Sequence, residues 1–233
     1  MKRSIAAIAL FGLTVSVAGL PACTSRQATS TTEQPAESTN SSSGGMGQME
    51  HGGVDQMDHS NMGMMEMDLG PADESFDLRF IDAMTMHHQG AVQMAEDALQ
   101  KSERAEIQEL ATNIIEAQER EISQMKQWRQ AWYPDVSDEP VMYDAQMGHM
   151  MPMSQEMKAM MMMHMDLGAA DAEYDLRFIN AMIPHHEGAV DMAKEALEKS
   201  NQPEIKQLAQ DILDSQQPEI DQMTEWKQAW YEQ

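Results

Sequence analysis

A histidine doublet that occurs twice constrains the fold of this chain more than any other feature of its sequence. The doublet His87-His88 lies in the run FIDAMTMHHQGAVQMA, and His185-His186 lies in FINAMIPHHEGAVDMA, 98 residues further on. The same offset aligns residues 68–133 with residues 166–231 without a gap. The chain therefore contains a duplicated unit, and any structure proposed for the doublet must suit both copies.

Each copy predicts two antiparallel helices joined by a very short turn. Apolar residues recur every three or four positions after Asp73, which is suited to an N-cap. A second run of this kind extends from Ser102 to about Tyr133, and Pro134 ends it. Asp171 is the equivalent cap in the second copy. We expect an all-α fold in which residues 68–134 and 166–233 form two hairpins, related by a pseudo-twofold axis, that share one core.

The predicted helices carry a heptad seam that is the same in both copies. All fourteen seam residues are identical, whereas outward-facing positions differ; Gln89, for example, is replaced by Glu187. In the first copy the seam residues are Phe80, Met84, His87, Ala91, Met94, Ala98, Ile107, Ala111, Ile114, Gln118, Glu121, Met125, Trp128 and Trp132.

A polar layer interrupts this apolar seam. Antiparallel pairing places His87 opposite Gln118 and Met84 opposite Glu121. A buried carboxylate needs a cation or a hydrogen-bond donor beside it. These groups could satisfy one another and fix the register of the bundle, or they could hold a metal ion. The second imidazole of each doublet could join the same site, face the other hairpin or point to solvent.

Two segments outside the helices are rich in methionine and histidine. Residues 46–67 hold seven Met and two His among Gly, Asp and Gln, which is too polar a mixture for flexible core filler. Residues 135–165 link the two hairpins and hold eleven Met and two His, and the part from Ser154 onward could be helical. We expect both segments to be flexible and to offer weak thioether sites.

The ligand chemistry favours copper. Thioether sulfur is a soft, neutral ligand, and methionine with histidine in a chain whose one cysteine is Cys23 suits Cu(I), with Ag(I) as a mimic. Imidazole and carboxylate can also hold Cu(II), whereas zinc would use more His or Cys and no Met.

We predict two sets of metal ligands. Those in the helices are Met84, His87, His88, Met94, Gln118, Glu121, Met125, Met182, His185, His186, Met192, Gln216, Glu219 and Met223. Secondary ligands in the two methionine segments are His51, Met57, His59, Met62, Met64, Met65, Met67, Met147, His149, Met150, Met151, Met153, Met160, Met161, Met163, His164 and Met165.

The N-terminus predicts export. Residues 1–22 have a Lys2-Arg3 start and an apolar run, which is typical of a signal peptide. The sequence before Cys23 is similar to a lipobox, although Pro21 departs from the usual pattern. Residues 23–45 are rich in Ser and Thr and read as a disordered tether. We expect an envelope or periplasmic protein anchored to a membrane through a lipid on Cys23, or one cleaved near Ala22 with a free thiol.

The charge of the chain excludes some partners. Its formal charge is -24, from 15 basic and 39 acidic residues, so it would repel nucleic acid and anionic lipid headgroups. A single cysteine allows no internal disulfide and no zinc–thiolate site. A metal ion is the expected partner, and other copper-handling proteins of the envelope are candidates.

The two histidine runs, each with its Gln-x-x-Glu-Ile-x-x-Met-x-x-Trp partner helix, resemble the bacterial domain-of-unknown-function 305 family. The family pattern MIPHH is complete at residues 182–186, whereas Thr85-Met86 precede the first doublet. This resemblance implies a ferritin-like four-helix arrangement. For the CopM-type members of the family, it implies extracytoplasmic copper binding in copper tolerance.

Three functions remain open. The chain could buffer or sequester copper and pass it on by ligand exchange. It could be a ferritin-like metal oxidase, but no Glu stands three residues before a doublet histidine, as a di-iron site would need, so we expect no enzyme beyond a weak cuprous oxidase activity. It could also be a helical interaction module whose polar layer only sets register.

Overall fold

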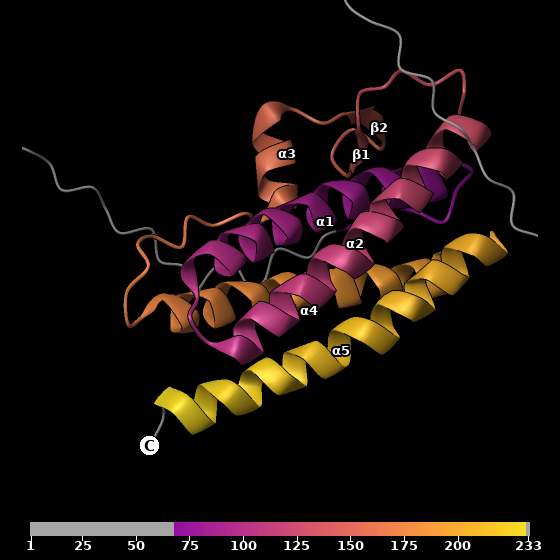
Figure 1. The fold of residues 1–233 in the computed structure, drawn as a ribbon. Coiled ribbons are helices and arrows are strands. Elements are labelled where there is room, and N and C mark those ends of the chain that lie inside the picture. Colours follow the sequence, from indigo (N-terminus) through magenta and orange to yellow (C-terminus); the bar gives the residue numbers. More distant parts are fainter. Residues whose placement is uncertain (1–67, 232–233) are drawn as a thin grey trace, which may run out of the picture. The chain divides into compact units, whose positions relative to one another are not determined.

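The computed structural model describes residues 68–231, which form five helices and one two-stranded sheet (Figure 1). The elements in order are α1 (Phe76–Lys101), α2 (Ala105–Trp132), β1 (Val141–Asp144), β2 (His149–Pro152), α3 (Gln155–Met162), α4 (Tyr174–Lys199) and α5 (Pro203–Tyr231). The predictions for residues 1–67, which include the signal peptide, Cys23, the tether and the first methionine segment, lie outside the described residues.

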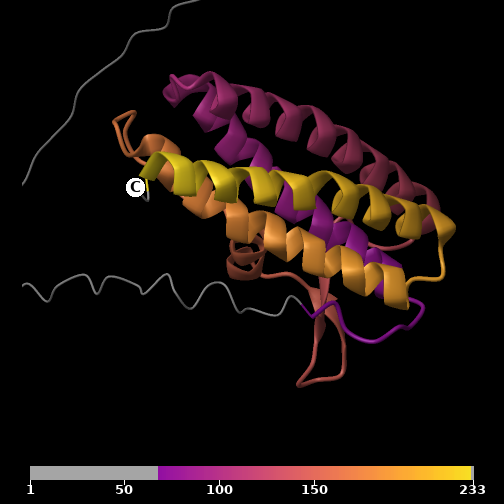
Figure 2. The ribbon, with the colours of Figure 1, turned by 90° about the horizontal axis from the view of Figure 1, so that it is seen from below.

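The predicted all-α fold of two hairpins is confirmed. Helices α1 and α2 form one hairpin and α4 and α5 form the other, and the hairpins meet along α1 and α4 (Figure 2). Ser102 and Ser200 end α1 and α4 in extended conformations. Pro184 and Pro218 lie inside the continuous helices α4 and α5.

The first helix of each hairpin begins later than the sequence indicates. Asp73 was expected to be the N-cap, but α1 starts at Phe76 and Ser75 precedes it. The Asp73 side chain instead accepts a hydrogen bond from the Ser75 amide (2.9 Å) and pairs with Arg79 (2.9 Å). Asp171 does the same for the Glu173 amide in the second copy. The aspartate therefore closes a turn before the helix, because its carboxylate accepts a hydrogen bond from the backbone amide two residues later.

The apolar core has two parts on either side of the point where α1 and α4 meet. Each part combines the start of the first helix of one hairpin with the end of the first helix of the other. Phe80 and Met192 belong to one part, and Phe178 and Met94 belong to the other. This arrangement makes α1 and α4 antiparallel. Small buried residues allow the close approach of the two helices; they are Ala83, Ala91, Ala95, Ala98, Ala181, Ala189, Ala193 and Ala196.

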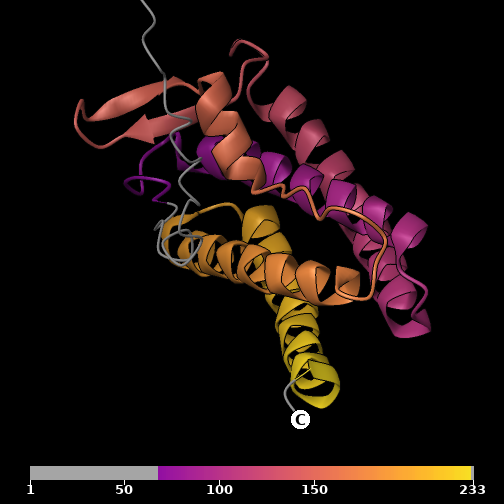
Figure 3. The same cartoon turned by 90° about the vertical axis from the view of Figure 1, so that its left-hand side faces the viewer.

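The linker between the hairpins is folded, so the prediction that residues 135–165 are flexible is wrong. Strands β1 and β2 pair antiparallel, with Met142 opposite Met151 and Asp144 opposite His149. Helix α3 follows and begins where expected, because the Ser154 side chain accepts a hydrogen bond from the Met157 amide. The β-hairpin and α3 lie on α1, away from α5 (Figure 3).

An ion pair found only in the first repeat fixes this linker. Arg129 on α2 pairs with the buried Asp82 on α1 at 2.5 Å and donates to the carbonyl of Glu139. The other Asp82 oxygen accepts a hydrogen bond from the Val141 amide. The second repeat has Asn180 and a lysine at the two equivalent positions. The linker therefore has its polar anchor on the first hairpin.

Within residues 68–231, no helix combines the length and the apolar character that crossing a membrane would require.

Candidate metal centre

The two histidine doublets meet at the centre of the α1–α4 contact. The ring centroids of His87 and His185 lie 3.8 Å apart, and those of His185 and His186 lie 6.4 Å apart. All four imidazoles are at most 1% exposed. The pairing follows from the duplication, since a pseudo-twofold axis between two antiparallel helices brings equivalent residues face to face.

The environment of His87 and His185 keeps both rings neutral. Burial lowers the pKa of His87 well below its ordinary value, and the neighbouring His185 lowers it further. Burial, with a contribution from His186, lowers the pKa of His185 to about 3. A neutral imidazole has one ring nitrogen with a free lone pair, which is the form that binds metals.

The second histidine of each doublet contacts a carboxylate on the partner helix of its own hairpin. His88 Nε2 donates to Glu121 Oε2 at 2.6 Å, and His186 Nε2 donates to Glu219 Oε2 at 2.8 Å. We expected Glu121 to lie opposite Met84, so the contact between Glu121 and His88 was not predicted. A helical step of about 100° separates neighbours, so His87 faces the other hairpin while His88 faces α2.

Several nitrogen and oxygen atoms in this centre are buried without a hydrogen-bond partner among the described residues. They are both ring nitrogens of His87, Nδ1 of His88, His185 and His186, and Oε1 of Gln118 and Gln216. Buried polar groups are ordinarily paired, so a cluster of this kind calls for a bound ion or ordered water. Since His88 and His186 donate from Nε2, their Nδ1 atoms are the free lone pairs.

The predicted methionine ligands in the helices lie in the apolar core on both sides of the histidines. Met84, Met125 and Met192 belong to one part of the core, and Met94, Met182 and Met223 belong to the other. Each is at most 1% exposed. Met125 sulfur accepts a contact from the Thr85 hydroxyl at 3.8 Å.

Helix α3 contacts the centre through a backbone carbonyl, and the sequence analysis did not predict this contact. His185 Nε2 donates to the Met162 carbonyl at 3.1 Å. A side chain on Gly90 would place its Cβ 1.7 Å from the same carbonyl oxygen, so only glycine allows α3 this close to α1. An isolated glycine inside a helical pattern was the available signal, and it occurs in both copies as Gly90 and Gly188.

The predicted secondary ligands that the structure describes divide into exposed and packed residues. Met147 is 66% exposed at the tip of the β-hairpin, and Met160 is 42% exposed on α3. Met153 is buried, and Met161 packs on the core with it. Intermediate positions are held by Met150, Met151, Met163 and Met165, while His149 and His164 are exposed. His51, Met57, His59, Met62, Met64, Met65 and Met67 lie outside the described residues.

The chemistry of this centre is that of a soft donor set. Among residues 68–231, no three His, Cys, Asp or Glu side chains converge on one point, so those side chains do not make a hard-cation site. Imidazole nitrogens flanked by thioethers favour Cu(I), which accepts low coordination numbers and neutral ligands. The carboxylates of Glu121 and Glu219 accept hydrogen bonds from the imidazole N–H groups and orient the rings, as the hydrogen-bond partners of metal-binding histidines commonly do.

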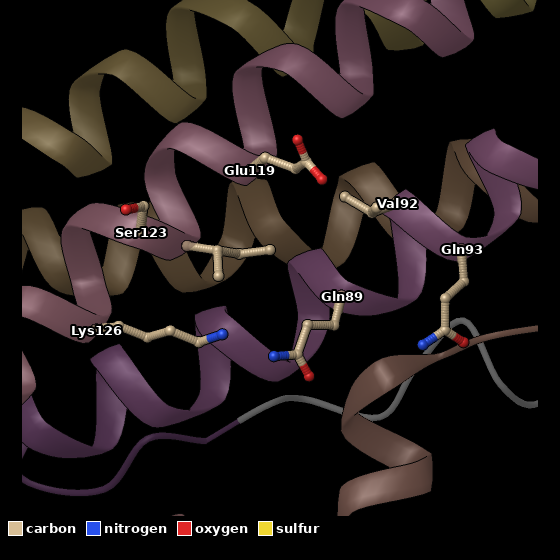
Figure 4. Close-up of a pocket in the computed structure, with 7 residues that line it drawn as sticks. Gln89, Val92, Gln93, Glu119, Ser123 and Lys126 are labelled. Atoms are coloured by element: carbon tan, nitrogen blue, oxygen red, sulfur yellow. The ribbon is translucent and has the colours of Figure 1, made fainter. Parts of the chain in front are cut away.

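The open hollow between α1 and α2 has a different character. It lies on the outer face of the first hairpin and is lined by Gln89, Val92, Gln93, Glu119, Ile122, Ser123 and Lys126 (Figure 4). None of these residues is a thioether or imidazole donor. The candidate centre therefore does not coincide with this hollow, and its four histidines are buried in the core.

Comparison with known proteins gives one family match. A family model described as a domain of unknown function (DUF305) matches residues 24–129 and residues 77–227. A curated relative, the uncharacterized protein L153 of Acanthamoeba polyphaga mimivirus, is 49% identical over 49 residues, which are 21% of this chain and 32% of that protein. The chain thus matches about a third of the length of that relative.

Solved structures of CopM are similar to this chain. CopM in its Cu(II)-bound form is 44% identical, with a TM-score of 0.54, and the match covers 66% of this chain and 97% of that chain. The Cu(I)-bound form is 41% identical with a TM-score of 0.52 over the same shares. A DUF305 fragment from Deinococcus radiodurans is 27% identical, with a TM-score of 0.51 over 66% of this chain and 96% of that one.

Proposed function

The chain belongs to the DUF305 family, and on that premise we propose that it is an extracytoplasmic copper-binding protein that buffers or sequesters Cu(I) and Cu(II). The observation that carries the proposal is the buried cluster of four histidines, in which each ring has a nitrogen without a partner among the described residues. Leaving such atoms unpaired costs about 1–3 kcal/mol each. A soft metal ion would offset that cost with ligand bonds.

The known ligands of similar proteins support copper as the cargo. CopM is known in Cu(I)-bound, Cu(II)-bound and Ag-bound forms. Both halves of this chain retain the histidine doublet, the glutamate and the seam methionines. We therefore assign His87, His88, His185 and His186 as the imidazole donors, at most two of them to one ion, because no three of these side chains converge among the described residues. Met84 and Met182 would be thioether donors from the core.

The exposed methionines give the protein a second, weaker class of site. Met147 at the tip of the β-hairpin and Met160 on α3 are accessible to a metal complex in solution. Thioethers do not lose a proton on binding, so such sites remain competent at acidic pH. In this proposal copper is captured on the surface and passed to the buried histidines, and no catalytic turnover is involved.

The ligand set can be tested by X-ray absorption of the protein loaded with one equivalent of Cu(I). The proposal predicts scattering from both nitrogen and sulfur ligands. A variant in which His87, His88, His185 and His186 are replaced by glutamine should lose the imidazole contribution while circular dichroism shows intact helices. A spectrum of sulfur ligands alone, unchanged in the variant, would assign copper to the methionines and leave the histidines with a purely structural role.

Export and anchoring through Cys23 are part of the same proposal. The apolar run before Cys23 and the Ser/Thr-rich residues after it support this assignment. Cell fractionation should place the full chain with membranes in the envelope. A Cys23→Ala variant should be released from the membrane fraction or keep its uncleaved signal peptide, whereas a fully processed variant that stays with the membrane would remove lipidation from the proposal.

A further inference from the structure

Helix α4 has a docking surface that matches the one α3 covers on α1. We propose that residues 62–67, immediately before the described part of the chain, dock on α4 over Gly188 as residues 160–165 dock on α1 over Gly90. In this arrangement the Met64 carbonyl accepts a hydrogen bond from His87, as the Met162 carbonyl does from His185. Four independent observations carry the inference.

The first observation is that the repeat extends upstream of residue 68. With the offset of 98 residues, Met62, Met64, Met65 and Met67 align with Met160, Met162, Met163 and Met165. Met162 provides the carbonyl that His185 contacts, so its counterpart is Met64. The histidines and the helical glycines obey the same offset, so the two docking surfaces occupy equivalent positions in the two repeats.

The second observation is where the chain enters the described structure. Lys199 on α4 donates to the Gly70 carbonyl at 2.8 Å, and the Leu69 amide donates to Glu195 at 3.5 Å. In the other copy, Lys101 on α1 donates to the Gly168 carbonyl at 2.6 Å. The residues that follow each methionine segment are therefore held at the same place on opposite helices. Residues 69 and 70 therefore lie beside α4, as residue 168 lies beside α1.

The third observation is a pair of unmatched partners on the α4 side. His185 Nε2 has the Met162 carbonyl, but neither ring nitrogen of the equivalent His87 has a partner among residues 68–231, although the ring is fully buried. Gly90 is buried, whereas Gly188 is only half-buried. Both differences are what a second covering segment would remove.

The fourth observation is a reciprocal exchange of charge. His164 and Glu96 line one hollow between the linker and α1. The equivalent residues in the other copy are Glu66 and Lys194. In one copy a basic residue of the linker, His164, lines the same hollow as an acidic residue of α1, Glu96. In the other copy the acidic Glu66 would lie near the basic Lys194 of α4. The exchange preserves complementarity between the segment and Lys194, which is exposed and pairs with Asp191 on its own helix at 3.1 Å.

The docked segment would bring the thioethers of residues 62–67 beside the histidines of the first repeat. This consequence rests on the proposed copper function, whereas the docking itself does not require metal.

Cross-linking between engineered cysteines tests the docking in metal-free protein. Residues 24–233 contain every described element and no cysteine. The test pair is Glu66→Cys with Lys194→Cys, joined by a short bifunctional maleimide. The reference pair is His164→Cys with Glu96→Cys, whose positions line one hollow. The control pair is Glu66→Cys with Gln207→Cys, because Gln207 is exposed near the start of α5, which follows α4 after a short turn.

We expect the test pair to react at a rate similar to that of the reference pair and roughly tenfold faster than the control pair, because docking raises the effective concentration. Equal rates for the test and control pairs would overturn the proposal, since an undocked segment samples both positions.

A second measurement tests whether residues 62–67 dock directly over Gly188. An open helical position gains stability when glycine becomes alanine. Docking over Gly188 predicts that Gly188→Ala lowers Tm in residues 24–233, as Gly90→Ala does by displacing the Met162 carbonyl. A rise in Tm for Gly188→Ala would overturn the register even if the segment cross-links.

Discussion

At the residue scale, neighbouring histidines in one doublet perform different tasks because a helix turns about 100° per residue. His87 and His185 face each other across the two hairpins, whereas His88 and His186 turn toward Glu121 and Glu219. The doublet thus joins the contact between the hairpins to the polar layer within each hairpin. One histidine alone could not do both.

The lowered pKa values of His87 and His185 predict acid-sensitive stability in the metal-free protein. Unfolded imidazoles bind protons below about pH 6.5, whereas the folded His185 does so only near pH 3. The unfolded state therefore binds more protons between these values, and the free energy of unfolding falls as pH is lowered. We expect a loss of about 1.4 kcal/mol per pH unit for each histidine.

Urea denaturation between pH 7 and pH 5 checks this dependence, in a range above the ordinary carboxylate pKa values. The double variant His87→Gln with His185→Gln should show a much flatter profile. Equal slopes for the two proteins would mean that these imidazoles take up protons in the folded state.

The carboxylate partners of the second histidines should tune metal affinity without binding the ion. Glu121→Gln removes the charge that orients His88, and loss of such a partner typically weakens metal binding about 10–100-fold. Competition with a chromophoric Cu(I) chelator measures the change. Glu119→Gln is the matched control, because Glu119 lies two residues away on the exposed side of α2. A similar small effect in both variants would remove Glu121 from the metal centre.

At the element scale, the linker shows how an ion pair can break the symmetry of a duplication. The helices of the two repeats have nearly the same lengths and bounds. The Asp82–Arg129 pair exists only in the first repeat, and it holds the backbone before and within β1. The start of the β-hairpin is therefore anchored by two residues of one repeat.

Removal of the arginine should release this linker. Arg129→Met leaves the buried Asp82 carboxylate uncompensated, and breaking such a pair typically costs about 3–5 kcal/mol of unfolding free energy. Hydrogen exchange should also increase in β1 and β2. The control is Lys227→Met at the equivalent position of α5, which we expect to change stability by less than about 0.5 kcal/mol. Retained protection of β1 in Arg129→Met would contradict this role.

The sequence predicted the helices better than the segments between them. A seam of identical residues in two copies identifies the hairpins, because the 3.6-residue period repeats over many turns. The folded linker escaped prediction, because its order depends on an ion pair between Arg129 and Asp82, and Asp82 lies 59 residues before Val141 in the sequence. The Asp73 cap was misplaced because the same carboxylate can cap a turn as readily as a helix.

At the scale of the whole molecule, the duplication explains the central cluster. Two copies of one hairpin pack about a pseudo-twofold axis, and equivalent residues at the axis meet their own counterparts. The sequence supplied both histidine doublets and the glutamates, but the contact between the hairpins could not be read from the seam within each. Only that contact brings His87 to His185. The histidine centre is thus a property of the pair of repeats.

The structure of the whole molecule also relates the buried metal-binding side chains to the exposed ones. The exposed methionines are on the β-hairpin and α3, and α3 contacts the centre through the Met162 carbonyl. A route from surface to centre would require α3 to move away from His185. Copper that binds only at the surface would need no such movement, so stoichiometry and affinity together separate the two accounts.

The most direct test is a Cu(I) titration of residues 24–233 against a chromophoric chelator, run beside a variant in which His87, His88, His185 and His186 are replaced by glutamine. A second variant replaces the exposed Met147, His149 and Met160, which leaves the buried linker methionines in place. We predict that the histidine variant loses the tightest copper sites and the surface variant keeps them. Tight binding that survives in the histidine variant and disappears in the surface variant would contradict the central role of the buried histidines.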